Sequence, residues 1–118
     1  MKKKLSENQQ VITLISLLND IILWPGLHDV RTVKEIHFIT FGYKMSKSTP
    51  ADRMIVADFL LEFRKFAKKY LKDRTDQAWY KIIASRTPSD EEGLKMFEII
   101  FKLFTEAAHF KSVGLSPV

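Results

Sequence analysis

Apolar residues recur every three to four positions along most of the chain, which is the period of an α-helix with one buried face. Over residues 6–23 the apolar arc contains Val11, Leu14, Ile15 and Leu18. Over residues 50–72 a similar arc lies opposite a face rich in lysine and arginine. The pattern therefore predicts amphipathic helices over both segments. The apolar arc of the second one contains Val56, Phe59, Leu60, Phe63, Phe66, Ala67, Tyr70 and Leu71.

Capping residues mark where the predicted helices begin, because a side-chain oxygen that accepts from free backbone amides stabilises a helix N-terminus. Three segments have a serine or threonine followed three residues later by glutamate or glutamine, and a fourth has threonine followed by proline. These starts predict helices over 6–23, 32–41, 50–72 and 89–110. The paired caps are Ser6 with Gln9, Thr32 with Glu35 and Ser89 with Glu92, and Thr49 precedes Pro50 and Asp52.

Two segments are less clearly marked. A short fifth helix is expected over 76–85, with Thr75 or Asp73 as its cap. Residues 32–45 alternate apolar and polar side chains in a way that also suits a strand. We favour a helix there because of the Thr32 cap, and because a lone strand would have no partner elsewhere in the sequence.

The breaks between these elements are too short to be domain linkers. They contain Pro25, Gly42 and Pro88, and each coincides with the end of a predicted helix. We therefore expect one domain over 1–118, with disordered tails at 1–5 and 112–118. The expected fold class is all-α, a compact bundle of four to five amphipathic helices.

The last predicted helix differs from the others because its apolar residues spread over roughly 220° of its circumference. Such a helix has two apolar faces to bury. Each large apolar side chain that stays exposed to solvent forgoes about 1.5 to 3 kcal/mol of burial free energy. It is expected either at the centre of the bundle or at an interface with a second molecule. Its apolar residues are Leu94, Met96, Phe97, Ile99, Ile100, Phe101, Leu103, Phe104, Ala107, Ala108 and Phe110.

Composition narrows the classes of protein. The 118 residues are 46% hydrophobic and 28% charged, which is typical of a folded globular chain. There is no cysteine, which removes disulfides and thiolate chemistry and fits the cytoplasm, the expected location. Polar residues interrupt every apolar run, so no membrane span is expected, and the N-terminal segment lacks the pattern of a cleaved signal.

No known catalytic or ligand motif is present. The glycines form neither a phosphate-binding loop nor a dinucleotide-binding pattern, and the histidines lack metal-ligand spacing. Asp58 and Glu62 are one turn apart, but no Glu followed three residues later by His accompanies them, so we interpret them as surface residues that pair with Lys65 or Lys69. We expect no enzyme activity, no cofactor and no metal.

The positive charge is local. The formal net charge is +5, and residues 64–86 contain eight bases against two acids. Lysine and arginine side chains in such a segment can bind the phosphates of a nucleic acid, and Trp79 and Tyr80 can stack on its bases. Sequence-independent nucleic-acid binding is therefore the alternative function. The ordinary interpretation is a solvated helix face. The residues in question are Arg64, Lys65, Lys68, Lys69, Lys72, Arg74 and Lys81.

The leading hypothesis is a non-enzymatic binding or regulatory module that acts through protein contact. The doubly apolar last helix carries this hypothesis, and a second copy of the chain is the first expected partner. Trp24 lies at a turn, where a tryptophan serves either as an anchor for a partner or as a lid on the core. The predicted interface consists of Met96, Ile99, Leu103, Phe110 and Trp24.

Overall fold

The computed structural model describes residues 5–107, and its regular backbone is helical throughout. The predicted all-α bundle of four to five helices is confirmed. Of the predicted tails, residues 1–4 and 112–118 lie outside the described residues, and Leu5 packs against the core. The elements are the 3-10 helix η1 (Leu5–Glu7), α1 (Gln9–Leu23), the 3-10 helix η2 (Pro25–His28), α2 (Val33–Met45), α3 (Pro50–Tyr70), α4 (Trp79–Ser85) and α5 (Asp90–Ala107).

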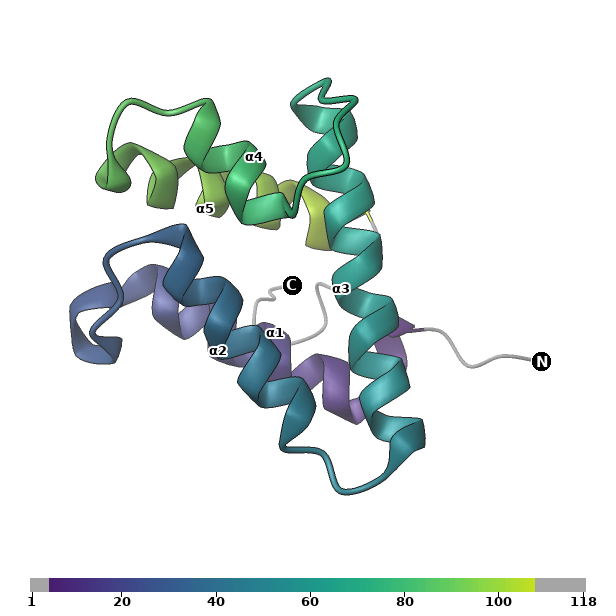
Figure 1. Cartoon of the computed structure of the whole chain (residues 1–118). Helices are drawn as coiled ribbons and strands as arrows, with labels where there is room; N and C mark the ends of the chain where they lie inside the picture. Colours follow the sequence, from purple (N-terminus) through teal and green to yellow (C-terminus); the bar gives the residue numbers. More distant parts are fainter. Residues whose placement is uncertain (1–4, 108–118) are drawn as a thin grey trace.

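Two helical hairpins lie along one long helix (Figure 1). The first hairpin consists of α1 and α2, the second of α4 and α5, and both lie on the same side of α3. Helices α2 and α3 each pack against all the other α-helices, whereas α5 packs chiefly against α2, α3 and α4. The surfaces of α2 and α3 therefore adjoin every part of the bundle.

Three of the predicted helix starts are confirmed in atomic detail. Thr32 Oγ1 accepts from the amide of Glu35 at 3.2 Å, and the Glu35 carboxylate accepts from the amide of Thr32 at 3.0 Å. Thr49 Oγ1 accepts from the amide of Asp52 at 3.1 Å, and Ser89 Oγ accepts from the amide of Glu92 at 3.1 Å. Backbone amides at these ends are thereby satisfied, which is what positions α2, α3 and α5.

Two predicted starts are wrong. Helix α1 begins at Gln9 and not at Ser6, because Asn8 Oδ1 accepts from the amides of Gln10 and Val11. Helix α4 begins at Trp79, and neither Asp73 nor Thr75 caps it. Asp73 instead accepts hydrogen bonds from the amide and hydroxyl of Thr75, which closes a turn before α4.

The predicted helix ends also shift. Helix α3 ends at Tyr70, two residues early, because Lys72 adopts the left-handed conformation, with φ of 54°. The amide of Asp73 then donates to the carbonyl of Lys68, which satisfies the helix C-terminus. Helix α2 runs on to Met45, four residues beyond the predicted end at Phe41, and residues 32–45 form a helix as favoured.

Part of the core is a cluster of stacked and edge-on aromatic rings among aliphatic side chains. Phe63 of α3 lies with its ring centroid 5.3 to 5.8 Å from four other rings, in edge-on geometry. Such pairs add stabilisation beyond the area that they bury. The ring cluster thus lies where α3, α4 and α5 meet, and the four rings belong to Trp79, Phe97, Phe101 and Phe104.

Helix α5 buries one face and leaves part of a second face exposed. Phe97, Ile100, Phe101 and Phe104 are buried, but the side of the helix that carries Ile99 and Leu103 remains partly open. Helix α5 is therefore not enclosed on all sides by the other helices of the described bundle. Within residues 5–107 no helix has both the length and the apolar character needed to cross a bilayer.

The capping box of α2 supplies the first testable prediction. Replacing Thr32 by alanine removes the acceptor for the amide of Glu35, so the free energy of unfolding should fall by about 1 kcal/mol. Urea unfolding followed by circular dichroism measures the change. Ser48→Ala, at an exposed loop position, serves as the control and should leave the midpoint unchanged. Equal midpoints for Thr32→Ala and the wild type would show that the box contributes nothing.

Candidate functional site

Helix α2 carries apolar residues on two faces. Val33, Ile36 and Thr40 are buried in the bundle, while Phe38, Phe41 and Met45 lie on the outer side. Their spacing of three and then four residues places these three side chains on one face of the helix. They are 55%, 49% and 54% exposed, and we call them the α2 stripe. Three large apolar side chains in a row are therefore open to water.

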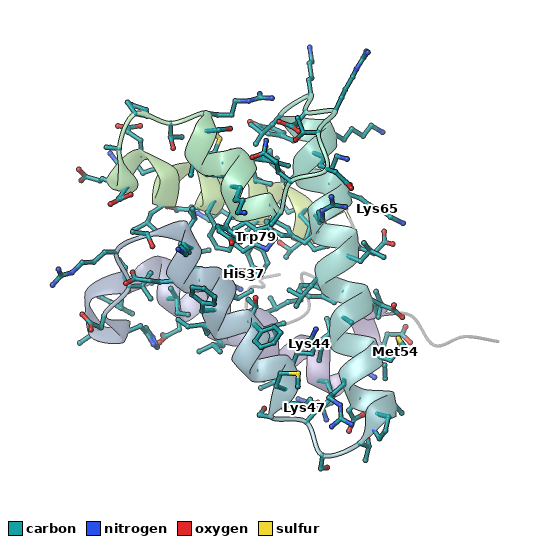
Figure 2. All side chains as sticks on the ribbon, viewed as in Figure 1. His37, Lys44, Lys47, Met54, Lys65 and Trp79 are labelled. Carbon is teal, nitrogen blue, oxygen red and sulfur yellow. The ribbon has the colours of Figure 1, made fainter. Side chains whose placement is uncertain are left out.

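A hollow of about 250 Å³ adjoins the α2 stripe, between α2, α3 and the start of α4. Its walls are mainly apolar, and Phe41 and the half-exposed Leu61 form part of its rim. Met54, also exposed, projects from α3 and is not among the residues that line the hollow (Figure 2). We call the hollow the α2–α3 cleft; it is lined by His37, Thr40, Phe41, Lys44, Ala57, Leu60, Leu61, Arg64, Ala78 and Trp79.

Aromatic rings build one end of the cleft. The imidazole of His37 stacks on Tyr80 with a centroid distance of 4.5 Å and meets the edge of Trp79 at 6.3 Å. Figure 2 shows His37 and Trp79 between α2 and α4. The pKa of His37 is lowered below its ordinary value, mainly by burial of the imidazole and to a smaller extent by the nearby positive charge of Lys44. His37 is therefore neutral at pH 7, and it serves as a ring of the wall.

The charge of the cleft comes from Lys44 on α2 and Arg64 on α3. Lys44 Nζ lies 5.1 Å from the ring centroid of Phe41, and Lys34 Nζ lies 5.9 Å from that of Phe38, so both cations stand over the α2 stripe. Arg64 donates to Asp76 at 3.1 Å and to the carbonyl of Gln77 at 3.3 Å. Among the residues that line the cleft there is no carboxylate.

No model of a known protein family matches the chain, and no curated protein or solved structure resembles it significantly. Function must therefore be inferred from the geometry of the surface.

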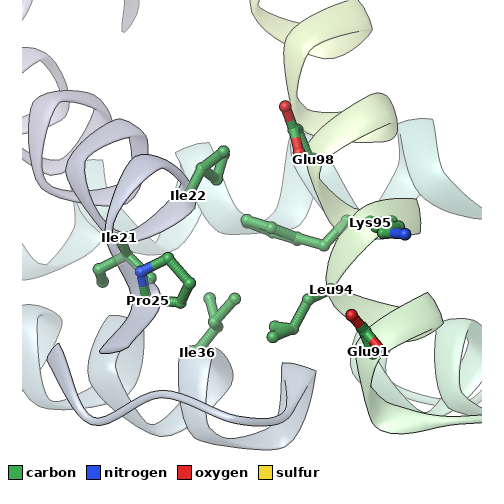
Figure 3. A pocket seen from close by; sticks show the side chains of 9 residues that line it. Ile21, Ile22, Pro25, Ile36, Glu91, Leu94, Lys95 and Glu98 are labelled. Carbon is green, nitrogen blue, oxygen red and sulfur yellow. The ribbon is translucent and has the colours of Figure 1, made fainter. Parts of the chain in front are cut away.

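A second hollow, of about 190 Å³, lies between the end of α1 and α5. Its apolar floor includes Ile21, Ile36 and Phe97, which are buried core residues. Its charged rim contains both acids and a base, and it lacks a stripe like that on α2. This hollow is therefore a weaker candidate than the cleft, although it is more enclosed. Figure 3 shows the side chains around it, among them Ile21, Ile22, Pro25, Ile36, Leu94, Glu91, Lys95 and Glu98.

The residues predicted from the sequence as an interface lie on α5 and at the junction of α1 and η2, with Phe110 beyond the described part of the chain. Ile99 and Leu103 are partly exposed on α5, whereas Met96 is half-buried against the core. Trp24 is 57% exposed at the junction of α1 and η2, so it is not a lid on the core.

The bases of the predicted basic segment fall into two groups, those with an acidic partner in the fold and those without an ion pair among residues 5–107. Arg64 is tied to Asp76, Lys65 lies 3.6 Å from Glu62, and Arg86 donates to Asp73 and to the carbonyl of Leu71. The pairing of Glu62 with Lys65 agrees with the interpretation of Glu62 as a surface residue. Within residues 5–107 no ion pair involves the other predicted bases, which lie along α3 (Lys68, Lys69), after its end (Lys72, Arg74) and on α4 (Lys81).

Sequence reasoning missed the α2 stripe, although its signal was present. The alternation over 32–45 that suits a strand arises because α2 has apolar side chains on both its inner and its outer face. Phe38, Phe41 and Met45 recur at the helical spacing used by anchors in helix grooves. The cleft forms because α2, α3 and α4 are brought together by the tertiary fold. No local sequence pattern predicts this arrangement.

Proposed function

We propose that this chain is a non-catalytic module that binds another protein, and that the α2 stripe with the α2–α3 cleft is its binding surface. The observation that carries this proposal is the row of three half-exposed apolar side chains on a helix whose inner face belongs to the core. Because these side chains are already about half buried, covering each one contributes about half of the 1.5 to 3 kcal/mol that burial of a whole large side chain supplies. Contiguous exposed apolar surface of this kind is typical of interaction sites.

The size of the cleft supports a protein partner. Small-molecule sites usually enclose about 300 to 1,000 Å³. The cleft is smaller, at about 250 Å³, and it is open to solvent along the α2 stripe. A hollow of this size suits one or two anchoring side chains of a partner, with the surrounding stripe covered by the rest of its surface.

A paired substitution tests the proposal. Phe41→Glu places a charge in the middle of the α2 stripe, and Leu27→Glu places the same charge at an exposed apolar position on η2. Each full-length variant is immobilised and exposed to extract from the native cell, and the retained proteins are quantified by mass spectrometry. Proteins that the wild type retains should be depleted by about tenfold or more on Phe41→Glu and kept on Leu27→Glu. Retention of the same proteins by Phe41→Glu would contradict the proposal.

Self-association through α5 is the second candidate. It is favoured by Ile99 and Leu103, which lie one turn apart and are both partly exposed. Sedimentation equilibrium at micromolar concentration measures the mass, and Leu103→Glu should convert any dimer to monomer. A strictly monomeric wild type would remove this candidate and leave the α2–α3 cleft unaffected.

Nucleic-acid binding through residues 64–86 ranks below both. Arg64, Lys65 and Arg86 already have acidic partners within the fold, which reduces the charge available for phosphates. Its test is the salt dependence of retention on heparin, compared between the wild type and a variant with Lys65, Lys68, Lys69 and Lys72 replaced by glutamate. Steep salt dependence that is lost in the variant would favour nucleic acid.

A further inference from the structure

The α2–α3 cleft has the shape of a groove between two helices. Its long walls are α2 and α3, and the first residues of α4 close one end. The α2 stripe runs from Phe38 to Met45, which is two turns or about 10 Å along the helix. A helix laid in such a groove presents anchors at positions i, i+3, i+4 and i+7, a spacing that matches the stripe. The shape therefore fits a third helix better than an extended segment.

The charges of the cleft have one sign on both walls. Lys44 projects from α2 and Arg64 from α3; no carboxylate lies among the lining residues, but Arg64 is paired with the exposed carboxylate of Asp76 at 3.1 Å. Lys34 Nζ, 5.9 Å from the ring centroid of Phe38, adds to the positive potential beside the α2 stripe. Arg64 keeps N–H donors beyond those used for Asp76 and Gln77, because a guanidinium has five. A complementary surface therefore carries an acid opposite Lys44, and a second acid opposite Arg64 shares the guanidinium with Asp76.

The same charges argue against other occupants. A second copy docked on the same face would bring lysine and arginine against lysine and arginine, which costs free energy. A bilayer is flat, whereas Leu60 and Trp79 lie inside a concave hollow that a bilayer would leave uncovered. A nucleic-acid strand would pair with the bases but leave Phe38 and Met45 without apolar contact.

We propose that the α2–α3 cleft binds an amphipathic α-helix of another protein, with large apolar side chains packed between α2 and α3 and with aspartate or glutamate residues paired to Lys44 and Arg64. This inference rests on the proposed function and adds the class of partner to it. The partner helix buries its apolar face against Phe41, Leu61 and the α2 stripe. Lys44 supplies the main charge contact, and Arg64 on the opposite wall adds a hydrogen bond while it stays paired with Asp76.

The probe is a fluorescein-labelled synthetic helix of about 18 residues, long enough to be helical in isolation. It has leucine and phenylalanine at i, i+3, i+4 and i+7, with glutamate on both flanks; a second peptide has lysine in place of every glutamate. Fluorescence anisotropy measures binding to the full chain. In a Trp24→Phe background, emission from Trp79 in the cleft wall reports that the cleft itself is occupied. The acidic peptide should bind at least about tenfold more tightly than the lysine peptide.

Charge reversal in the protein provides the matched comparison. Lys44→Glu should weaken the acidic peptide by about tenfold and tighten the lysine peptide, because the sign of the wall changes. Lys69→Glu is the control, since Lys69 belongs to the same helix as Arg64 but lines a different hollow, beside Phe104. It should change the affinity by less than about twofold, the effect of one exposed charge at a distance.

Several results would overturn the inference. These are equal or tighter binding of the lysine peptide, no binding of either peptide, or no effect of Lys44→Glu. If the acidic peptide leaves Trp79 emission unchanged, a change with phosphatidylserine vesicles would assign the cleft to a membrane, and a change with an oligonucleotide would assign it to a nucleic acid. Cellular partners lost on Phe41→Glu but kept on Lys44→Glu would overturn this inference alone, whereas partners kept on Phe41→Glu would overturn the proposed function.

Discussion

Replacing Phe63 by alanine is expected to lower the free energy of unfolding by about 3 to 5 kcal/mol, the range for removal of a buried phenylalanine ring. Phe63 is 2% exposed and meets the rings of Trp79, Phe97, Phe101 and Phe104. Its removal would leave a cavity where α3, α4 and α5 meet, and neighbouring helices can close such a cavity only in part. Domains of this size have a total stability of about 5 to 15 kcal/mol, so the variant should be close to unfolding.

Phe38→Ala is the matched control for Phe63→Ala. The same ring is deleted, but Phe38 is largely exposed on the α2 stripe and contributes little to the core. Its loss should change the free energy of unfolding by less than about 1 kcal/mol. Urea unfolding monitored by circular dichroism gives both values. Similar losses for the two variants would mean that the ring cluster around Phe63 does not stabilise the fold as described.

A second large effect is expected from two adjacent positions on α5. Ile100 is 0% exposed, whereas Ile99 is 48% exposed on the other side of the helix. Ile100→Asp places an unpaired carboxylate in the core, and its desolvation together with the lost apolar contact should cost about 5 kcal/mol or more. Ile99→Asp places the same group at the surface and should cost less than about 1 kcal/mol.

The comparison is sharp because both variants have the same composition and the same helix propensity. Circular dichroism and the dispersion of amide NMR resonances at low protein concentration measure the outcome. Ile100→Asp should lose the cooperative unfolding transition, and Ile99→Asp should keep it. If Ile99→Asp also unfolds the isolated chain, α5 is buried on both faces within one molecule, and the packing described for it is wrong.

The positions of the helices could be predicted where capping side chains act locally. Thr32, Thr49 and Ser89 accept from amides within three residues, so their role is encoded in a short stretch of sequence. The start of α4 could not be predicted in this way. The segment 76–77 is held by Arg64 of α3, which donates to the side-chain carboxylate of Asp76 and to the backbone carbonyl of Gln77, and these contacts span more than ten residues.

The binding surface was harder to predict than the fold. The sequence shows that α5 is apolar around most of its circumference. Most of that apolar surface is buried against α2, α3 and α4. Helix α2 has a weaker amphipathic pattern because apolar residues lie on two of its faces. The helical period of three to four residues is therefore harder to see in its sequence. Which of them faces the core is decided by contacts with α1, α3, α4 and α5, which a local pattern does not contain.

Hydroxyl-radical footprinting of the dilute, isolated chain tests the exposed outer face of α2 most directly. Phe38, Phe41 and Met45 should be oxidised readily and Phe97 and Phe101 should be protected, because the first three side chains are about half exposed and the last two are buried. Addition of the acidic helical peptide should protect Phe41 and Met45, while Trp24, which is exposed at the junction of α1 and η2, keeps its rate. Protection of Phe41 and Met45 in the free chain at low concentration would contradict the account.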